Sequence, residues 1–372
     1  MRFETKAIHA GLDIGNPTKA IIPPISPSTI YEIDAEGRKE SDFHYTRLGN
    51  PNRLQFEYVA AALEGGETAS AFSSGIAAGM AILQSMDPGD HIIIPEDVYS
   101  GNRRMVQTIM TGWKLESSFI NMTDPDTIAA HIKPNTRLIW IETPSNPLMR
   151  ITDIAATVAL AKSHGLLTVV DNTWPTPVNQ QPLELGADLV LHSTSKYFGG
   201  HSDILGGIVI SKKDDDFAEK VRIIQRFGGA VPSPQDCWML SRSTRTLAYR
   251  MKGHNENAGI IARYLESHKK VAEVYYPGLE SFAGYDIAKK QMTGFGGMIS
   301  FLIKGSKEEA VKIVGRSKLI KRATSLGGVE STWEHRQSSE GEGSITPDDL
   351  IRLSVGLEHP QDIIDDLEEA LG

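Results

Sequence analysis

Residues 166–211 read LLTVVDNTWPTPVNQQPLELGADLVLHSTSKYFGGHSDILGGIVIS and carry the clearest signal of the fold. This stretch holds three short apolar runs, LLTVVD at 166–171, DLVLHS at 188–193 and GIVIS at 207–211. Runs that are apolar throughout are typical of strands that helices cover on both faces of a sheet. We therefore predict consecutive strands of a mostly parallel sheet here.

Earlier segments of the chain extend this pattern. Two more apolar runs are HIIIP at 91–95 and LIWIE at 138–142. The segments 101–111, 124–132 and 152–164 are long enough to be the helices that cross from one parallel strand to the next. The predicted fold class is α/β, with a central, mostly parallel sheet sandwiched by helices.

The chain divides into three predicted parts. Prolines interrupt residues 1–44, which show no clear period and are expected to form an N-terminal arm. The large domain is predicted over residues 45–240. Residues 241–372 begin with a helical pattern and then mix strands with helices, which favours a smaller α+β C-terminal domain. The segment SSEGEGS at 338–344 is expected to be an exposed loop.

The composition excludes several classes of partner. The 372 residues include 38 Lys and Arg against 47 Asp and Glu, a net charge of −9. Such a surface repels nucleic acid and anionic membranes, so neither is expected as a partner. Cys237 is the single cysteine, which excludes an intrachain disulfide and a thiolate metal site, so no metal is predicted. No secretion signal or apolar membrane segment is evident, and a cytoplasmic location is expected.

Two residues that follow neighbouring predicted strands indicate the chemistry. Asp171 ends the run at 166–171, and Lys196 comes directly after the run at 188–193. Ligands of open parallel sheets bind at the carboxyl ends of the strands, so both side chains are expected in one crevice. An amine there suggests a Schiff base, and pyridoxal 5'-phosphate requires such a lysine together with an acid that keeps its ring nitrogen protonated.

Other residues could complete such a site. The serines and glycine that open the Ala-rich helix predicted over 71–86 could bind a phosphate together with Ser193 and Ser195. Tyr99 follows a strand and could cover a flat heterocycle. Arg352 lies inside an apolar strand pattern, and a buried arginine requires an anionic partner such as a substrate carboxylate.

Simpler interpretations exist for these residues. Asp171 could cap a turn, and Lys196 could be a solvated loop lysine. The segment STSK at 193–196 also fits the Ser-x-x-Lys pattern of acyl hydrolases, although the companion motifs of that class are missing. A non-enzymatic binding protein of the same fold is another alternative. A pyridoxal phosphate enzyme should be yellow, and borohydride should attach its chromophore covalently to Lys196. An acyl hydrolase or a binding protein should show neither property.

Nine motifs, in order and almost along the whole chain, resemble those of the Cys/Met-metabolism group of fold-type I pyridoxal phosphate enzymes. They are YTRLGNP (45–51), FSSGIAA (72–78), DVYSGN (97–102), ETPSNP (142–147), VVDNTW (169–174), HSTSKYFGGHSD (192–203), QDCWML (235–240), SLGGVES (325–331) and IRLSVGLE (351–358). This group contains cystathionine γ-synthase, γ-lyase and β-lyase. The resemblance implies the fold-type I transferase architecture.

The resemblance also implies roles at the cofactor. Lys196 would form the Schiff base and shuttle protons, and Tyr99 would stack on the ring as the second catalytic residue. Asp171 would pair with the ring nitrogen. The phosphate would be held by Gly75, Ile76, Ser193 and Ser195.

Two further groups of residues receive roles from the resemblance. Tyr45 and Arg47 would complete the phosphate site of a neighbouring subunit, which implies a homotetramer with shared active sites. The small amino-acid substrate would be oriented by Asn146, Ser325 and Arg352, with Arg352 on the α-carboxylate.

The reaction implied is γ-replacement or γ-elimination on homoserine esters or cystathionine-like substrates. The family often has acidic residues at the positions of His44 and Thr324, so a β-lyase or related C–S lyase acting on a substrate with an uncharged tail is the alternative. Gly101 stands where methionine γ-lyases tend to have cysteine, and Leu326 where β-lyases often have tryptophan. The stretch at 332–344 is unusual and is expected to change the roof of the substrate pocket.

Overall fold

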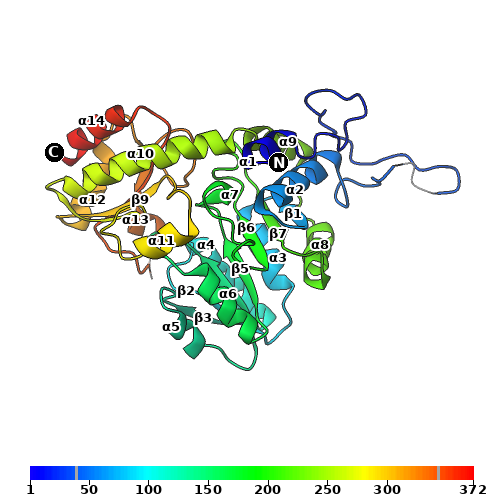
Figure 1. Ribbon diagram of the computed structural model, residues 1–372, viewed down its shortest axis with the longest axis horizontal. Coiled ribbons are helices and arrows are strands. Elements are labelled where there is room, and N and C mark those ends of the chain that lie inside the picture. Colours follow the sequence, from blue (N-terminus) through cyan, green and yellow to red (C-terminus); the bar gives the residue numbers. More distant parts are fainter. Residues whose placement is uncertain (38–40, 342–343) are drawn as a thin grey trace.

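The structure, a computed structural model, describes residues 1–37, 41–341 and 344–372. At its centre lies a seven-stranded sheet of order β1-β7-β6-β5-β4-β2-β3 (Figure 1). Its strands are β1 (Thr68–Phe72), β2 (His91–Pro95), β3 (Glu116–Ile120), β4 (Thr136–Glu142), β5 (Leu167–Asp171), β6 (Leu189–His192) and β7 (Gly207–Ser211). Strands β2 to β6 pair in parallel, which confirms the predicted α/β sheet.

The strand at 207–211 runs in the other direction from the one we expected. β7 is antiparallel to both β6 and β1. No helix lies between β6 and β7, so the chain reverses direction and β7 pairs with β6 as its antiparallel neighbour. The sequence pattern also missed β1 and β3, which occupy the two edges of the sheet, where half-exposed polar residues replace the continuous apolar run.

Helices cover both faces of this sheet. The helices that follow β1 in this part of the chain are α3 (Gly75–Gln84), α4 (Ser100–Arg104), α5 (Pro125–Ala130), α6 (Ile154–Ser163), α7 (Thr176–Asn179) and α8 (Asp216–Gly228). Side chains alternate between the faces along each strand. Ile92 and Ile94 of β2 join one buried cluster with residues of α3, whereas Ile93 joins another with residues of α5 and α6.

The C-terminal part contains a five-stranded sheet of order β10-β11-β12-β9-β8. Its strands are β8 (Val271–Tyr275), β9 (Met298–Ile303), β10 (Lys321–Arg322), β11 (Thr332–His335) and β12 (Leu350–Ser354). α9 (Pro234–Thr244) packs on α2 (Pro51–Glu64) of the larger part. The helices that follow it are α10 (Leu247–Ser267), α11 (Tyr285–Gln291), α12 (Lys307–Arg316), α13 (Arg336–Glu340) and α14 (Pro360–Leu371). The long α10 leads from the larger part to the smaller one (Figure 1). The predicted division after residue 240 falls within α9 and stays a prediction.

Two local expectations need correction. The N-terminal arm, expected to be irregular, begins with α1 (Phe3–His9), whose Ala7 packs on Val59 and Leu63 of α2 (Pro51–Glu64). The segment at 338–344 is not only a loop, because its first three residues complete α13. Residues 342 and 343 lie outside the described chain. Among the described helices, none combines the length and the apolar character needed to cross a membrane.

Candidate active site

One cavity of about 790 Å³ lies between the two sheets and receives nearly all the predicted site residues. It opens at the carboxyl ends of β5 and β6, where open parallel sheets bind ligands. The predicted residues that line it are Gly75, Ile76, Tyr99, Asn146, Asp171, Ser193, Ser195, Lys196, Ser325 and Arg352. The larger part of the chain thus supplies the predicted cofactor residues, and the C-terminal part supplies Ser325 and Arg352.

Lys196 extends into this cavity from the loop after β6. Its Nζ donates a hydrogen bond of 2.5 Å to Ser325 Oγ. Burial lowers the pKa of the lysine to about 8, and the nearby charges of Arg352 and Arg336 act in the same direction. An amine with this pKa is partly neutral at physiological pH, as a nucleophile and proton acceptor must be.

Close backbone contacts hold the loop that carries Lys196 against the loop that carries Ser325. Ser325 has a left-handed φ of 80°, which is uncommon for a residue with a side chain. A Cβ on Gly327 would lie 2.8 Å from the Tyr197 nitrogen, so a glycine lets the two loops touch. From α10, Arg250 donates hydrogen bonds of 2.6 and 3.0 Å to the carbonyls of Tyr197 and Ser243. The loop that presents Lys196 is therefore anchored to the helix that joins the two parts.

Asp171, at the end of β5, has its orientation fixed by Thr173. The Thr173 backbone N–H donates to Asp171 Oδ1 at 3.1 Å, and its hydroxyl contacts the same oxygen at 2.5 Å. The hydroxyl oxygen also accepts the Ser193 backbone N–H at 2.9 Å. Because an amide must donate, the Thr173 hydroxyl proton is available for Asp171. Burial raises the pKa of Asp171, and both bonds from Thr173 oppose that shift.

Glu142 is a second carboxyl group in the cavity. It ends β4, is buried, and accepts the Tyr99 backbone N–H at 3.0 Å through Oε2. Burial raises its pKa well above the ordinary value, and the neighbouring charge of Asp171 raises it further. This residue fixes the backbone from which the Tyr99 ring projects.

The first turn of α3 forms a cradle for an anion. Ser74 caps the helix by accepting the Ala77 N–H at 3.1 Å, which leaves the amides of Gly75 and Ile76 without a partner inside the helix. A Cβ on Gly75 would lie 2.8 Å from that of Ser193, so only glycine allows this approach. The Ser195 hydroxyl is already bonded to the backbone of Gly206, accepting its N–H at 2.9 Å.

Tyr99 directly precedes α4, lines the cavity and is 42% exposed. A Cβ on Gly101 would lie only 2.5 Å from Cε1 of this ring. The cysteine expected at this position in methionine γ-lyases would therefore collide with the Tyr99 ring as it lies here.

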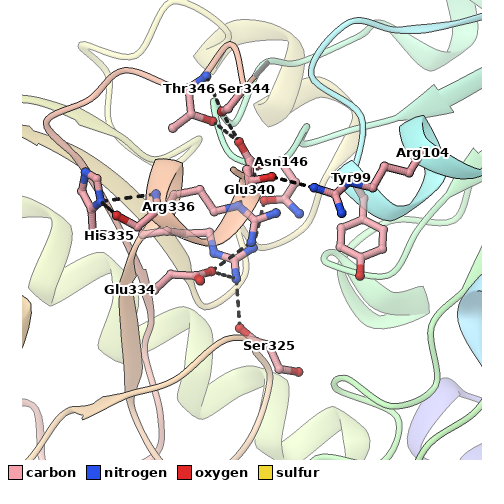
Figure 2. A network of polar contacts seen from close by, with 12 residues as sticks. Tyr99, Arg104, Asn146, Ser325, Glu334, His335, Arg336, Glu340, Ser344 and Thr346 are labelled. Atoms are coloured by element: carbon pink, nitrogen blue, oxygen red, sulfur yellow. Dashed lines mark hydrogen bonds and ion pairs between the residues drawn. The ribbon is translucent and has the colours of Figure 1, made fainter. Parts of the chain in front are cut away.

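At the opposite wall, Arg352 of β12 is buried and already has partners (Figure 2). It donates to Asn146 Oδ1 at 2.9 Å and to the Ser325 carbonyl at 3.2 Å, and it forms a short ion pair with Glu334. Burial lowers its pKa to about 10, and the charge of Arg336 adds to this effect. The guanidinium stays charged at neutral pH.

Sequence reasoning missed four of these residues. Glu142 and Thr173 follow strand ends inside the quoted motifs ETPSNP and VVDNTW, so the argument used for Asp171 could have found them. Glu334 and Arg336 fall in the unusual stretch at 332–344, but only the tertiary structure shows that they meet Arg352. Thr324 lines the cavity, as a substrate-contacting position should.

The structure does not bring Tyr45 and Arg47 to the cavity of their own chain. Arg47 donates a hydrogen bond of 2.6 Å to the Arg226 carbonyl, and its guanidinium lies 5.4 Å from the centre of the Tyr45 ring. The predicted role of both residues in a neighbouring subunit stays a prediction. His44 is likewise absent from the cavity lining, and the described residues contain no cluster of side chains suited to a metal ion.

The donors fit pyridoxal phosphate. The cavity offers two amides without partners inside α3 and the Ser193 hydroxyl for a phosphate, an oriented carboxylate at Asp171 for a ring nitrogen, and an amine of lowered pKa for an aldehyde. Because these groups lie on separate strand ends, the site requires the folded sheet and cannot be a local sequence feature.

Comparison with known proteins gives a consistent result. A family model described as "Cys/Met metabolism PLP-dependent enzyme" matches residues 4–372. Cystathionine gamma-synthase of Mycobacterium tuberculosis is 44% identical over 99% of this chain and 96% of its own length. Cystathionine beta-lyase of Lactococcus lactis is 43% identical, covering 99% and 98%. The solved structure of cystathionine gamma-lyase from Lactobacillus plantarum with L-serine has a TM-score of 0.94 and 39% identity, covering 100% of this chain and 98% of that one.

Proposed function

The chain belongs to the Cys/Met-metabolism family of pyridoxal phosphate-dependent enzymes, and we propose that it catalyses γ-replacement or γ-elimination on homoserine-ester or cystathionine-like amino acids. The observation that carries this proposal is the meeting of Lys196 and Arg352 at one cavity. An amine and a carboxylate-binding arginine are what an enzyme needs to bind an amino acid and remove its Cα proton.

The residues proposed to hold the cofactor follow from the geometry above. The amides of Gly75 and Ile76 and the Ser193 hydroxyl would bind the phosphate, with Ser195 beside them. The Asp171 carboxylate would accept a hydrogen bond from the ring nitrogen and keep that nitrogen protonated, and the Tyr99 ring would cover one face. When bound, pyridoxal phosphate supplies an aldehyde and an electron-withdrawing ring that stabilises negative charge at Cα.

The remaining chemistry belongs to side chains of this protein. Arg352 would bind the substrate α-carboxylate, with Asn146 holding the guanidinium in place. Lys196, with its pKa of about 8, would take the Cα proton and later return protons as an acid. Its hydrogen bond to Ser325 keeps the amine close to the end of the cavity where the substrate carboxylate is placed.

Product analysis separates the possible reactions. Purified enzyme would be incubated with O-acetyl- or O-succinylhomoserine, alone and with cysteine, and with cystathionine. Replacement gives cystathionine, whereas γ-elimination of cystathionine gives cysteine, 2-oxobutanoate and ammonia. If none of these substrates yields a product of γ-replacement or of γ-elimination, the proposed reaction is wrong.

The same assay tests the β-lyase alternative, which is kept because a cystathionine beta-lyase is 43% identical to this chain. β-Elimination of cystathionine gives homocysteine, pyruvate and ammonia instead. If pyruvate is the main oxoacid formed from cystathionine, the enzyme catalyses β-elimination and the proposed γ-elimination is wrong.

Lys196→Ala tests the role of the amine. We expect a loss of turnover of about 10²–10⁴-fold, the usual contribution of a general base, with the fold retained. In the unchanged protein, borohydride reduction followed by peptide mapping should place a pyridoxyl group on Lys196. Full activity of the variant, or a pyridoxyl group on another lysine, would contradict the assignment.

The proposal includes a homotetramer whose active sites are shared between subunits. Its support is that Tyr45 and Arg47 lie away from their own cavity, and that large apolar side chains of the N-terminal segment are exposed, with Ile21 82% and Ile30 70% accessible. Mixed assembly of Lys196→Ala and Arg47→Ala subunits should restore part of the activity, because some sites then receive both native residues. No recovery after subunit exchange would contradict shared sites.

The predicted location in the cytoplasm also remains part of the proposal. Its support is Cys237, the single cysteine of the sequence, which is fully buried. Burial raises the pKa of its thiol, as suits a protein that relies on no disulfide. Cell fractionation with an antibody against the protein would test it.

A further inference from the structure

Arg352 is paired internally by a residue placed opposite it in the sheet. Strands β11 and β12 are antiparallel, and their register sets Glu334 directly across from Arg352. The Glu334 Oε1 atom accepts a short hydrogen bond from Arg352 Nη2. Both side chains are buried, at 4% exposure each. A carboxylate of the protein therefore already lies on the arginine that we assign to the substrate carboxylate.

A second arginine binds the same oxygen. Arg336, the first residue of α13, donates to Glu334 Oε1 at 3.0 Å and to Glu340 Oε1 at 2.9 Å. Figure 2 shows Arg336 between these two carboxylates, next to the wall of the cavity. The network therefore contains one buried donor, Arg336 Nη2, and one buried acceptor, Glu334 Oε2, that have no partner among the described residues.

The charges of this network balance before any ligand arrives. Arg352 and Arg336 contribute two positive charges, and Glu334 and Glu340 contribute two negative ones. Buried charges are tolerated when they are paired in this way. A substrate carboxylate on Arg352 adds a negative charge next to Glu334, and two buried carboxylates repel each other.

We propose that Glu334 competes with the substrate carboxylate for Arg352, and that Arg336 retains Glu334 when the substrate binds. The pair of Glu334 and Arg336 then sets the carboxylate affinity of the active site. Arg336 can do this because it shares Oε1 of Glu334 with Arg352 and keeps Nη2 free for the same carboxylate. Both residues act through Arg352 and are positioning residues. This inference rests on the proposed role of Arg352.

The two substitutions that remove one charge each should act in opposite directions. Glu334→Gln removes the competitor and should tighten carboxylate binding about tenfold, a modest part of the interaction between two charges in a partly screened site. Arg336→Gln removes the retaining cation and should weaken binding by a similar factor. In the double variant Arg336 has no charged Glu334 left to retain, so binding should stay within about threefold of Glu334→Gln alone, because the effects of residues in direct contact are not additive.

The probe is propionate, a carboxylate without an amine, titrated into the holoenzyme by calorimetry. In parallel, Glu334→Gln should lower KM for the substrate with little change in kcat, which a general loss of structure would not do. Glu308→Gln, at an exposed position of α12, is the matched control for loss of a negative charge. Urea unfolding of each variant checks the fold. If Arg336→Gln does not fold, Arg336→Lys keeps the charge and should bind propionate nearly as the unchanged protein does.

The outcomes separate this inference from the proposed function. If Arg352→Gln leaves propionate binding unchanged, the assigned role of Arg352 is wrong and the inference fails with it. If Arg352→Gln weakens binding but Glu334→Gln weakens it too or leaves it unchanged, Glu334 orients Arg352 instead of competing for it. In that case only the inference is overturned. Tighter binding in Glu334→Gln that persists in the double variant, together with weaker binding in Arg336→Gln, supports it.

Discussion

Glu142 on β4 and Asp171 on β5 are directly paired residues of neighbouring parallel strands, and both side chains reach the cavity. Burial raises the pKa of each carboxyl group, and the charge of Asp171 raises that of Glu142 further. Thr173 donates one hydrogen bond to Asp171 from its backbone and faces it with its hydroxyl, whereas the hydrogen bonds that Glu142 accepts from the described residues come from the Tyr99 N–H. The environment therefore favours the negative charge of the pair on Asp171 and the protonated form on Glu142.

Glu142→Gln should consequently be mild. The amide is neutral like the protonated acid and still accepts the Tyr99 N–H, so kcat/KM should fall by about tenfold at most, or roughly 1.4 kcal/mol. Glu142→Leu leaves that buried N–H unpaired and should cost about 1–3 kcal/mol of folding free energy. Steady-state kinetics and urea unfolding measure the two effects. A fall in kcat/KM of the glutamine variant well beyond tenfold would show that the reaction needs an ionised Glu142.

Thr173→Val removes one hydrogen-bond donor from Asp171 while keeping the shape of the side chain. We expect the affinity for pyridoxal phosphate to fall by about 1 kcal/mol, the usual worth of such a bond, and Asp171→Asn to cost more because it removes the charge itself. Equilibrium dialysis measures both. Thr157→Val is the matched control, since the buried Thr157 hydroxyl has no partner among the described residues. Equal cofactor affinities of the two valine variants would contradict the role of Thr173.

The depressed pKa of Lys196 should make folding depend on pH in the cofactor-free protein. The folded amine has a pKa of about 8, against an ordinary value of 10.5. Between these values the unfolded chain binds more protons than the folded chain, so stability rises with pH. Below pH 8 the buried charge lowers the unfolding free energy of the unchanged protein by a constant amount, and this penalty disappears between pH 8 and pH 10.5. The unfolding free energy of the unchanged protein minus that of Lys196→Met should therefore rise from pH 8 to pH 10.5 and stay constant below pH 8. Urea denaturation at several pH values tests this, with Lys213→Met as a control at an exposed position. A difference that stays flat across the window would refute the shift.

Gly101→Ala should displace the Tyr99 ring. The new Cβ would lie 2.5 Å from Tyr99 Cε1 and 3.1 Å from Ile76 Cδ1, so the ring must move away from its place at the cavity. Overpacking of this kind costs about 1–3 kcal/mol, and we expect weaker cofactor binding of corresponding size. Gly112→Ala, where a Cβ meets no atom within 4 Å, is the matched control. Fluorescence titration with pyridoxal phosphate should separate the two variants, and identical affinities would show that the ring does not contact the cofactor.

The sequence by itself determined the α/β class, the family and the cofactor. The apolar runs at 91–95, 138–142 and 166–171 are buried strands because both of their faces are covered, and continuous burial leaves a continuous apolar signal. The positions of Asp171 and Lys196 at strand ends followed from the same pattern, and both line the cavity. Their assigned roles stay predictions.

Tertiary structure decided what no local pattern could express. The edge strands β1 and β3 carry mixed residues because one side of each has no neighbouring strand, and the direction of β7 depends on a connection without a helix. The ion pairs of Arg352 join residues that the register of β11 and β12 brings together, so their partners are a property of strand pairing. The raised pKa of Glu142 has the same origin, since a pKa depends on burial and on charges that only the folded chain places nearby.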